Sequence, residues 1–98
     1  MKIDLSLHNS ELYKGCNIEE VAGKLNLKTS PKDAVNIVGR NINGMLENIP
    51  ASERDEVVLT GPMAVWSYLV VFHTVIHRFN RVVYDDGRNG PIVVAAHG

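Results

Sequence analysis

Alternating and periodic apolar residues divide the first half of the chain into a strand and a helix. Residues 2–8 alternate polar and apolar side chains, which is typical of a half-buried strand. Residues 31–48 repeat apolar side chains at helical spacing. Ser30 precedes that repeat as a capping residue, and Pro31 occupies the first helical position. We therefore expect a first strand and a long amphipathic helix.

The segment between these two elements carries a weaker helix signal. Asn17 is followed three residues later by Glu20, the arrangement of a capping box, and this predicts a short helix over residues 17–22. The predicted helix is short because residues 25–27 could equally be extended.

The last third of the chain is predicted to form a strand, a helix and two further strands. Residues 57–59 form a continuous apolar run, and Gly61-Pro62 then opens an expected helix over residues 62–79. Two further short strands are expected at 82–84 and 92–96, and they can pair as a hairpin. A strand, a helix and a strand within about 30 residues is the pattern of a βαβ unit with parallel strands. We predict an α/β fold, a single compact domain over residues 1–98 with a βαβ unit and a C-terminal hairpin.

The expected helix over 62–79 is apolar almost all round, so it must be covered on both sides. In so small a domain a second subunit is a plausible cover, and we expect a homo-oligomer, a dimer or a tetramer. The longest apolar stretch, residues 62–76, is shorter than the roughly 20 residues that cross a bilayer. We interpret it as a buried helix and expect no membrane association.

Composition narrows the class of protein further. The net charge of −1 and the pI near 6.4 argue against a broad nucleic-acid-binding surface, although a local basic pocket stays compatible with them. Cys16 is the single cysteine, so an internal disulfide and a multi-cysteine zinc site are excluded. The start of the chain lacks a basic-then-apolar signal, and we expect a cytoplasmic protein.

Two groups on the expected βαβ unit can carry chemistry. Thr60 and Gly61 join a strand to a helix start, where free backbone N–H groups bind phosphates, although glycine there can also be simple punctuation. His73 and His77 are four residues apart and share one helix face, so they can present two imidazoles to one metal or phosphate. Equally, His73 can be a core histidine and His77 a C-terminal cap.

The turn after the next strand holds the remaining candidates. Asp85-Asp86-Gly87-Arg88 is a good hairpin turn, yet an aspartate just past a central parallel strand is also where α/β folds place ligand groups. Such a carboxylate can hold a cation together with a histidine, and Arg88 can clamp a phosphate. Whether His97 then meets His77 depends on the sheet geometry or on a neighbouring subunit.

Other reaction classes lack support. Cys16 has no flanking charge or motif and is interpreted as a structural thiol. The sequence contains no Walker loop and no glycine-rich dinucleotide fingerprint, so ATP hydrolysis and hydride transfer are poor interpretations.

These residues, in this order, resemble a known family over about residues 57–98. The resemblance is carried by Val57-Val58-Leu59-Thr60-Gly61-Pro62, Trp66, His73, Val83-Tyr84-Asp85, Arg88, Ile92-Val93-Val94 and His97. The chain is similar to the small ring nucleases of type III CRISPR systems (the Csx-three type). In that family a G-x-x-P-x-W segment enters a histidine-rich helix, and a V-Y-D-P-R-x-G turn and a V-V-V-x-S-H strand follow. This chain has Asp85-Asp86-Gly87-Arg88 where the family has Asp-Pro-Arg, so either aspartate can match.

The resemblance implies a fold, an activity and a set of partners. It implies a Rossmann-like, CARF-like sheet, assembly into dimers and higher forms, and cleavage of cyclic tetra-adenylate to linear products that ends the antiviral response. Manganese-dependent removal of 3′ adenylates from RNA is also known of the family. We therefore predict a CRISPR-associated phosphodiesterase. A cyclic-oligoadenylate sensor or sequestering module without turnover, a Mn-dependent RNA 3′-deadenylating exonuclease and a purely structural interaction protein are the alternatives.

The predicted site combines the residues above. The expected catalytic residues are His73, His77, Asp86, Arg88 and His97; the expected phosphate-binding residues are Thr60, Gly61 and Arg88; and Asp85, Asp86 and His77 are the expected ligands of Mn²⁺.

Overall fold

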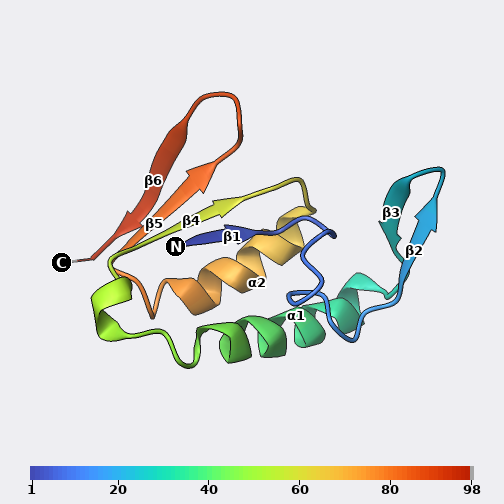
Figure 1. Cartoon of the computed structure of the whole chain (residues 1–98), viewed down its shortest axis with the longest axis horizontal. Coiled ribbons are helices and arrows are strands. Elements are labelled where there is room, and N and C mark those ends of the chain that lie inside the picture. The colour runs from blue at the N-terminus through green and yellow to red at the C-terminus, as the bar shows by residue number, and fades with distance from the viewer. Residues whose placement is uncertain (98) are drawn as a thin grey trace.

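A mixed four-stranded sheet forms the centre of the molecule (Figure 1), whose computed structural model describes residues 1–97. In spatial order the strands are β1 (Lys2–Asp4), β4 (Glu56–Thr60), β5 (Arg81–Asp85) and β6 (Pro91–Ala96). β1 and β5 run parallel to β4, and β6 runs antiparallel to β5. Three neighbouring strands therefore end at the same edge of the sheet, the carboxyl edge.

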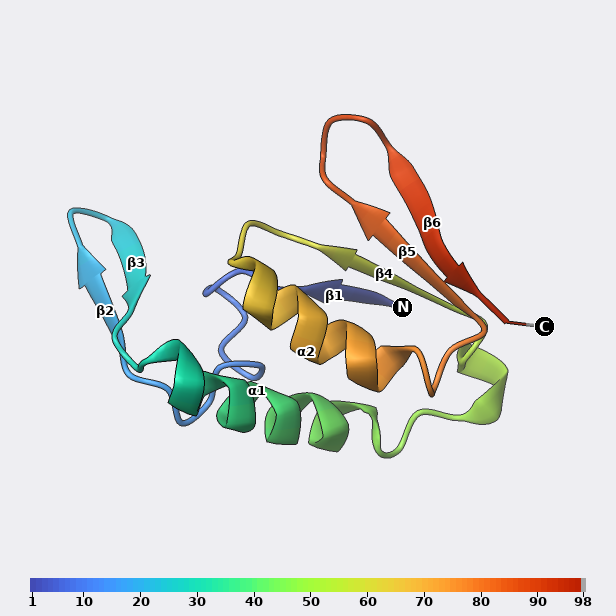
Figure 2. The same ribbon diagram turned by 180° about the vertical axis from the view of Figure 1, so that it is seen from behind.

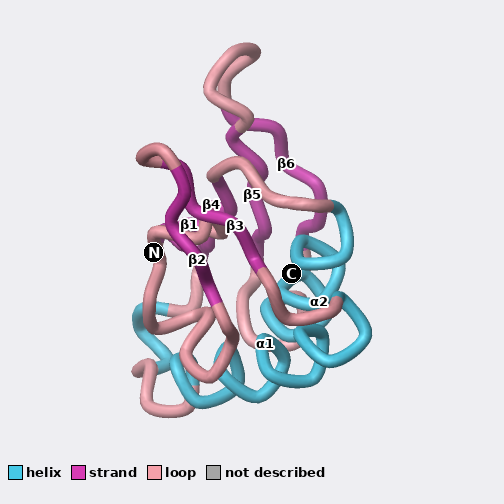
Figure 3. Tube along the Cα trace, turned by 90° about the vertical axis from the view of Figure 1, so that its right-hand side faces the viewer, coloured by secondary structure: helices cyan, strands magenta, loops and turns pink. Residues whose placement is uncertain are grey.

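Two helices cover one face of this sheet (Figures 2 and 3). They are α1 (Pro31–Leu46) and α2 (Val65–Val75), and they also pack against each other. One hydrophobic core joins both helices to the inward side chains of the strands, such as Val57 and Val82. No helix within residues 1–97 has the length and apolarity needed to cross a bilayer.

The predicted architecture of the last third is confirmed. β4, α2 and β5 form a βαβ unit with parallel strands, and β5 and β6 form the C-terminal hairpin. The molecule is thus a single compact α/β domain with a mixed sheet, consistent with a Rossmann-like fold. α2 begins three residues later than the expected start at residue 62, because residues 61–64 form a loop between β4 and the helix.

The predicted helix over residues 17–22 is wrong. The segment forms a hairpin of β2 (Ile18–Val21) and β3 (Lys24–Leu27), which stands away from the four-stranded sheet (Figure 1). Ala22 and Gly23 form its tip with φ angles of 52° and 79°, the conformation of a tight hairpin turn. The Asn17 backbone N–H donates to Thr29 Oγ1, so Asn17 closes the hairpin and caps no helix.

The first strand is also shorter than the expected 2–8, because the Asp4 carboxylate turns the chain after it. Its two oxygens accept from the backbone N–H and the hydroxyl of Ser6, at 2.8 and 2.9 Å. The loop that follows contributes Tyr13, which is 1% exposed, to the core. The Tyr13 hydroxyl donates to the Leu5 carbonyl and lies 2.9 Å from the hydroxyl of the fully buried Ser67 on α2.

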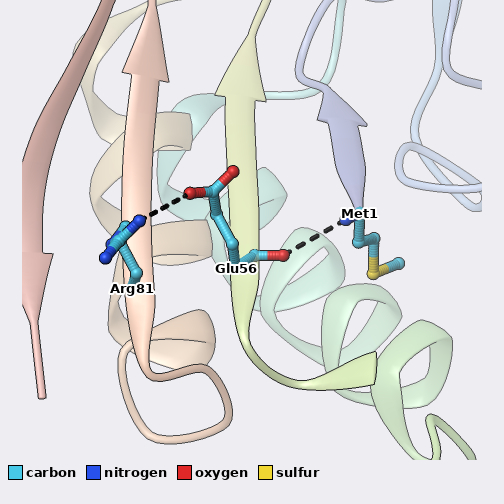
Figure 4. Close-up of polar contacts among 3 residues, drawn as sticks. All are labelled: Met1, Glu56 and Arg81. Carbon is cyan, nitrogen blue, oxygen red and sulfur yellow. Dashed lines mark hydrogen bonds and ion pairs between the residues drawn. The ribbon is translucent and has the colours of Figure 1, made fainter. Parts of the chain in front are cut away.

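At the opposite, amino edge of the sheet, polar contacts join Met1 and Arg81 to Glu56 at the start of β4 (Figure 4). The Met1 amino group donates to the Glu56 carbonyl at 3.1 Å, and Arg81 pairs with the Glu56 carboxylate at 3.4 Å. The short 3-10 helix η1 (Ala51–Glu53) leads into β4 at this edge.

Candidate functional site

Four of the predicted site residues meet in one pocket at the carboxyl edge. Thr60 pairs with Asp85 in the parallel register of β4 and β5, and the Thr60 hydroxyl donates to the Asp85 carbonyl at 2.9 Å. A pocket of about 290 Å³ opens there, and its lining includes Thr60, Gly61, Asp85 and Asp86. The carboxyl ends of parallel strands are where open α/β sheets bind ligands, so this carboxyl-edge pocket is the candidate site.

Gly61 fixes the geometry of the pocket floor. Its φ is 101°, and a Cβ atom there would overlap the Asp4 carboxylate and approach the Ser6 backbone nitrogen to 3.1 Å. The end of β1 therefore packs against the end of β4 with no room for a side chain. Asp4 and Ser6 complete this edge but were not predicted, because the pairing of β1 with β4 joins segments more than 50 residues apart.

The two aspartates of the turn have different surroundings. The Asp86 carboxylate accepts from the Asn89 backbone N–H at 2.9 Å, from the Arg88 backbone N–H at 2.8 Å and from the Asn89 side-chain amide at 3.1 Å. These backbone hydrogen bonds, with that of Asn89 the strongest, lower the pKa of Asp86. Asp86 therefore holds the turn in shape.

Asp85 retains an oxygen for a ligand. Its Oδ1 accepts from the Gly87 backbone N–H at 2.9 Å, whereas its Oδ2 has no hydrogen-bond partner among residues 1–97. Asp85 is half-buried beside the pocket, while Asp86 is exposed. Of the two aspartates that the sequence left equivalent, Asp85 is the one whose carboxylate is open to chemistry.

Arg88 lies in the same turn and is exposed. Within the described part of the chain its guanidinium makes no hydrogen bond and no ion pair. A planar cation with all its donors unused suits an incoming phosphate. Arg88 directly follows Gly87, the last residue of the pocket lining, and is not itself part of that lining.

The three predicted histidines lie at the other end of the molecule. His73 and His77 sit at the end of α2 with ring centroids 5.6 Å apart and an interplanar angle of 67°, and both are exposed. His97 follows β6, and its backbone N–H donates to the Asn80 carbonyl. We expected His97 at the level of Arg81 or Val82; because Ala96 pairs with Arg81, His97 lies one residue further along, opposite Asn80.

The length of β5 separates these histidines from the carboxyl-edge pocket. Its five residues rise about 3.3 Å each, so Asp85 lies roughly 13 Å beyond Arg81 along the sheet. His97 instead lines a second hollow, at the amino edge, together with Asp55, Asn80 and Arg81. The predicted catalytic set is thus divided between the two edges of the sheet within one subunit.

The predicted manganese ligands do not fit one ion in a single chain. His77 is at the amino edge, Asp85 is at the carboxyl edge, and the Asp86 carboxylate is already occupied by the turn. Within residues 1–97 no group of three or more histidine, cysteine, aspartate or glutamate side chains is arranged to hold a metal. Manganese dependence stays a prediction for the reaction assay.

Comparisons of the chain with protein-family models, with curated proteins and with solved structures find no match. The function of the carboxyl-edge pocket must therefore be argued from its own residues.

Proposed function

We propose that this protein is a ring nuclease, a phosphodiesterase that opens cyclic tetra-adenylate and so switches off a type III CRISPR antiviral response. The observation that supports the proposal is the carboxyl-edge pocket lined by Thr60, Gly61 and Asp85, with Arg88 in the adjoining turn. The resemblance of residues 57–98 to the small ring nucleases supplies the substrate class.

The reaction we propose needs one base, one cation and a substrate hydroxyl. A ribose 2′-oxygen forms a bond to the adjacent phosphorus while the bond from phosphorus to the 5′-oxygen breaks. The 2′-hydroxyl proton passes to the free Oδ2 of Asp85, and the leaving 5′-oxygen takes a proton from an acid or from water. The products are a 2′,3′-cyclic phosphate and a 5′-hydroxyl. Arg88 stabilises the negative charge that grows on the phosphoryl oxygens.

The negative charge around the pocket makes the Arg88 cation necessary for binding a phosphate there. Asp4, Asp85 and Asp86 place three carboxylates around the pocket, and these repel a phosphate. The Arg88 guanidinium is the cation in the same turn that opposes them. Lys2 on β1 shares a neighbouring hollow with Asp85 and is a second cation of the same chain near this carboxylate.

The test is to incubate the purified protein with cyclic tetra-adenylate, with and without Mn²⁺, and to separate the products. We expect linear product, with a loss of about 100-fold or more in turnover for Arg88→Ala, the size typical of removing one charge-stabilising donor. Asp85→Asn should lose activity, whereas Asp86→Asn should retain most of it. Arg40→Ala, which removes an exposed arginine of α1, is the matched control and should change turnover less than twofold.

Absence of linear product both with and without Mn²⁺ would exclude the ring-nuclease activity. Equal turnover in the two conditions would exclude manganese dependence. The same assay with an RNA that ends in 3′ adenylates tests the predicted exonuclease activity.

A second candidate function is a sensor that binds the cyclic nucleotide without cutting it. The observation that favours it is the position of the histidines, which leaves the pocket of one subunit without an imidazole at hand. Calorimetry that shows binding of cyclic tetra-adenylate, combined with no turnover, would support this function.

A further inference from the structure

An apolar groove opens beside the carboxyl-edge pocket, between α2 and the β5–β6 hairpin. Its volume is about 370 Å³, within the range of about 300–1,000 Å³ typical of small-molecule sites. Its lining includes Met63, Tyr68, Leu69, Phe72, Tyr84 and Val94. In the described part of the chain, no charged residue lines the groove.

The groove adjoins the carboxyl-edge pocket. Tyr84 lines both of them. The Tyr68 hydroxyl donates to the Gly61 carbonyl at 2.6 Å, which ties the groove wall to the pocket floor. The Tyr68 and Tyr84 rings meet edge to face, with centroids 5.3 Å apart. A ligand that occupies the pocket therefore has an aromatic, uncharged surface directly next to it.

The pair of cavities matches the chemistry of a nucleotide. A nucleotide joins a charged phosphate through a sugar to a flat aromatic base, and proteins hold unstacked bases against tyrosine and phenylalanine rings. We propose that the groove is a base subsite, which takes the adenine of a nucleotide whose phosphate lies in the carboxyl-edge pocket. The position of the phosphate in this proposal rests on the proposed function; the aromatic groove is a separate observation.

The first test compares two ligands that differ only in the base. Adenosine 5′-monophosphate and ribose 5-phosphate are titrated into the isotope-labelled full chain and followed by NMR. We expect both ligands to shift the backbone amides of Thr60 and Gly61. Only adenosine monophosphate should shift the methyl signals of Leu69 and Val94. Unmoved methyl signals with adenosine monophosphate, or equal shifts with both ligands, would overturn the base subsite.

The second test changes the groove wall while keeping the pocket. Tyr84→Leu removes a ring and should weaken the affinity for adenosine monophosphate at least tenfold, whereas Tyr84→Phe keeps the ring and should change it less than twofold. Equal affinities of these two variants would contradict the subsite. Because Tyr84→Leu can disturb folding, Leu69→Glu at a position that is 62% exposed serves as the second variant, and it should also lose at least tenfold.

These outcomes separate the subsite from the proposed function. If cyclic tetra-adenylate is neither bound nor cut while adenosine monophosphate still shifts Leu69 and Val94, the subsite holds and the ring-nuclease proposal fails. If the groove signals respond to protein concentration and not to adenosine monophosphate, the groove is a self-association surface and the subsite is overturned.

Discussion

At Gly61 the chain leaves β4 with a φ of 101°, against the Asp4 carboxylate and the Ser6 backbone. Any side chain there must adopt a left-handed backbone conformation and displace Asp4. We expect Gly61→Ala to lower the free energy of unfolding by about 1–2 kcal/mol or more, because the backbone strain alone costs that much. Urea unfolding measures this loss.

The matched control is another glycine replaced by alanine. Gly44 lies inside α1, and a Cβ atom added there has no neighbour within 4 Å. Gly44→Ala should therefore raise the free energy of unfolding by about 0.5–1 kcal/mol, because glycine is a poor helix former. Similar unfolding midpoints for the two variants would contradict the close packing at Gly61.

At the residue scale, the sequence predicted that Thr60, Gly61 and Asp85 lie where strands end, because a turn that follows a strand is visible in the order of residues; the structure brings these three residues to one pocket. The sequence could not choose between Asp85 and Asp86, since the choice depends on which carboxylate the turn consumes. Nor could it find the part that β1 plays in the pocket, because parallel pairing of distant segments leaves no local pattern.

At the element scale, the strongly periodic segments were predicted and the weakly periodic one was not. α1 and the β4–α2–β5 unit have long apolar repeats that specify their type. Asn17 and Glu20 have the spacing of a capping box, which predicted a helix. Ala22 and Gly23 instead adopt positive φ angles, and residues 18–27 form a hairpin. A two-residue turn therefore overrode the helix signal.

That hairpin should be the least stable element of the fold. A two-stranded hairpin is at best marginally stable alone, and here Ile18 packs against the core while Val21 is 50% exposed. We expect the amides of β2 and β3 to exchange with deuterium at least tenfold faster than those of β4, measured by NMR under native conditions. Equal protection of the two regions would show that the hairpin is packed more firmly than its contacts indicate.

For the whole molecule, the buried Tyr13 and the half-buried Tyr68 should set the alkaline limit of stability. Burial raises the pKa of Tyr13, and burial followed by the neighbouring Tyr84 raises the pKa of Tyr68 to about 12, against about 10 for a tyrosine in an unfolded chain. The unfolded chain therefore loses these protons first, so the contribution of these tyrosines to stability should be constant well below pH 10 and should fall between pH 10 and 12.

Urea unfolding at pH 8, 10 and 11 measures this fall. Tyr68→Phe removes one of the two groups, so its stability should fall less steeply with pH than that of the wild type. Parallel falls in both proteins would assign the alkaline loss to other groups.

The free edge of β6 should set the state of assembly. Within residues 1–97 β6 is an edge strand of the sheet; it carries no charged residue and exposes Ile92, Val93 and Val94 by 45–55%. An uncharged open edge pairs readily with another strand, and symmetric dimers are the commonest assemblies. Antiparallel pairing of two β6 strands would bring His97 of each subunit towards the partner's turn at Asp85–Arg88. His97 would then lie near Asp85 and Arg88 of the partner subunit.

Sedimentation equilibrium tests this arrangement. The wild type should have the mass of two chains, and Val93→Lys should be monomeric, because a charge on an edge strand opposes pairing. Val21→Lys introduces the same charge at a similarly exposed position on β2 and should remain dimeric. A monomeric wild type would contradict the assembly. If His97 also acts across the pair, Val93→Lys should lose turnover of cyclic tetra-adenylate as well, whereas Val21→Lys should retain it.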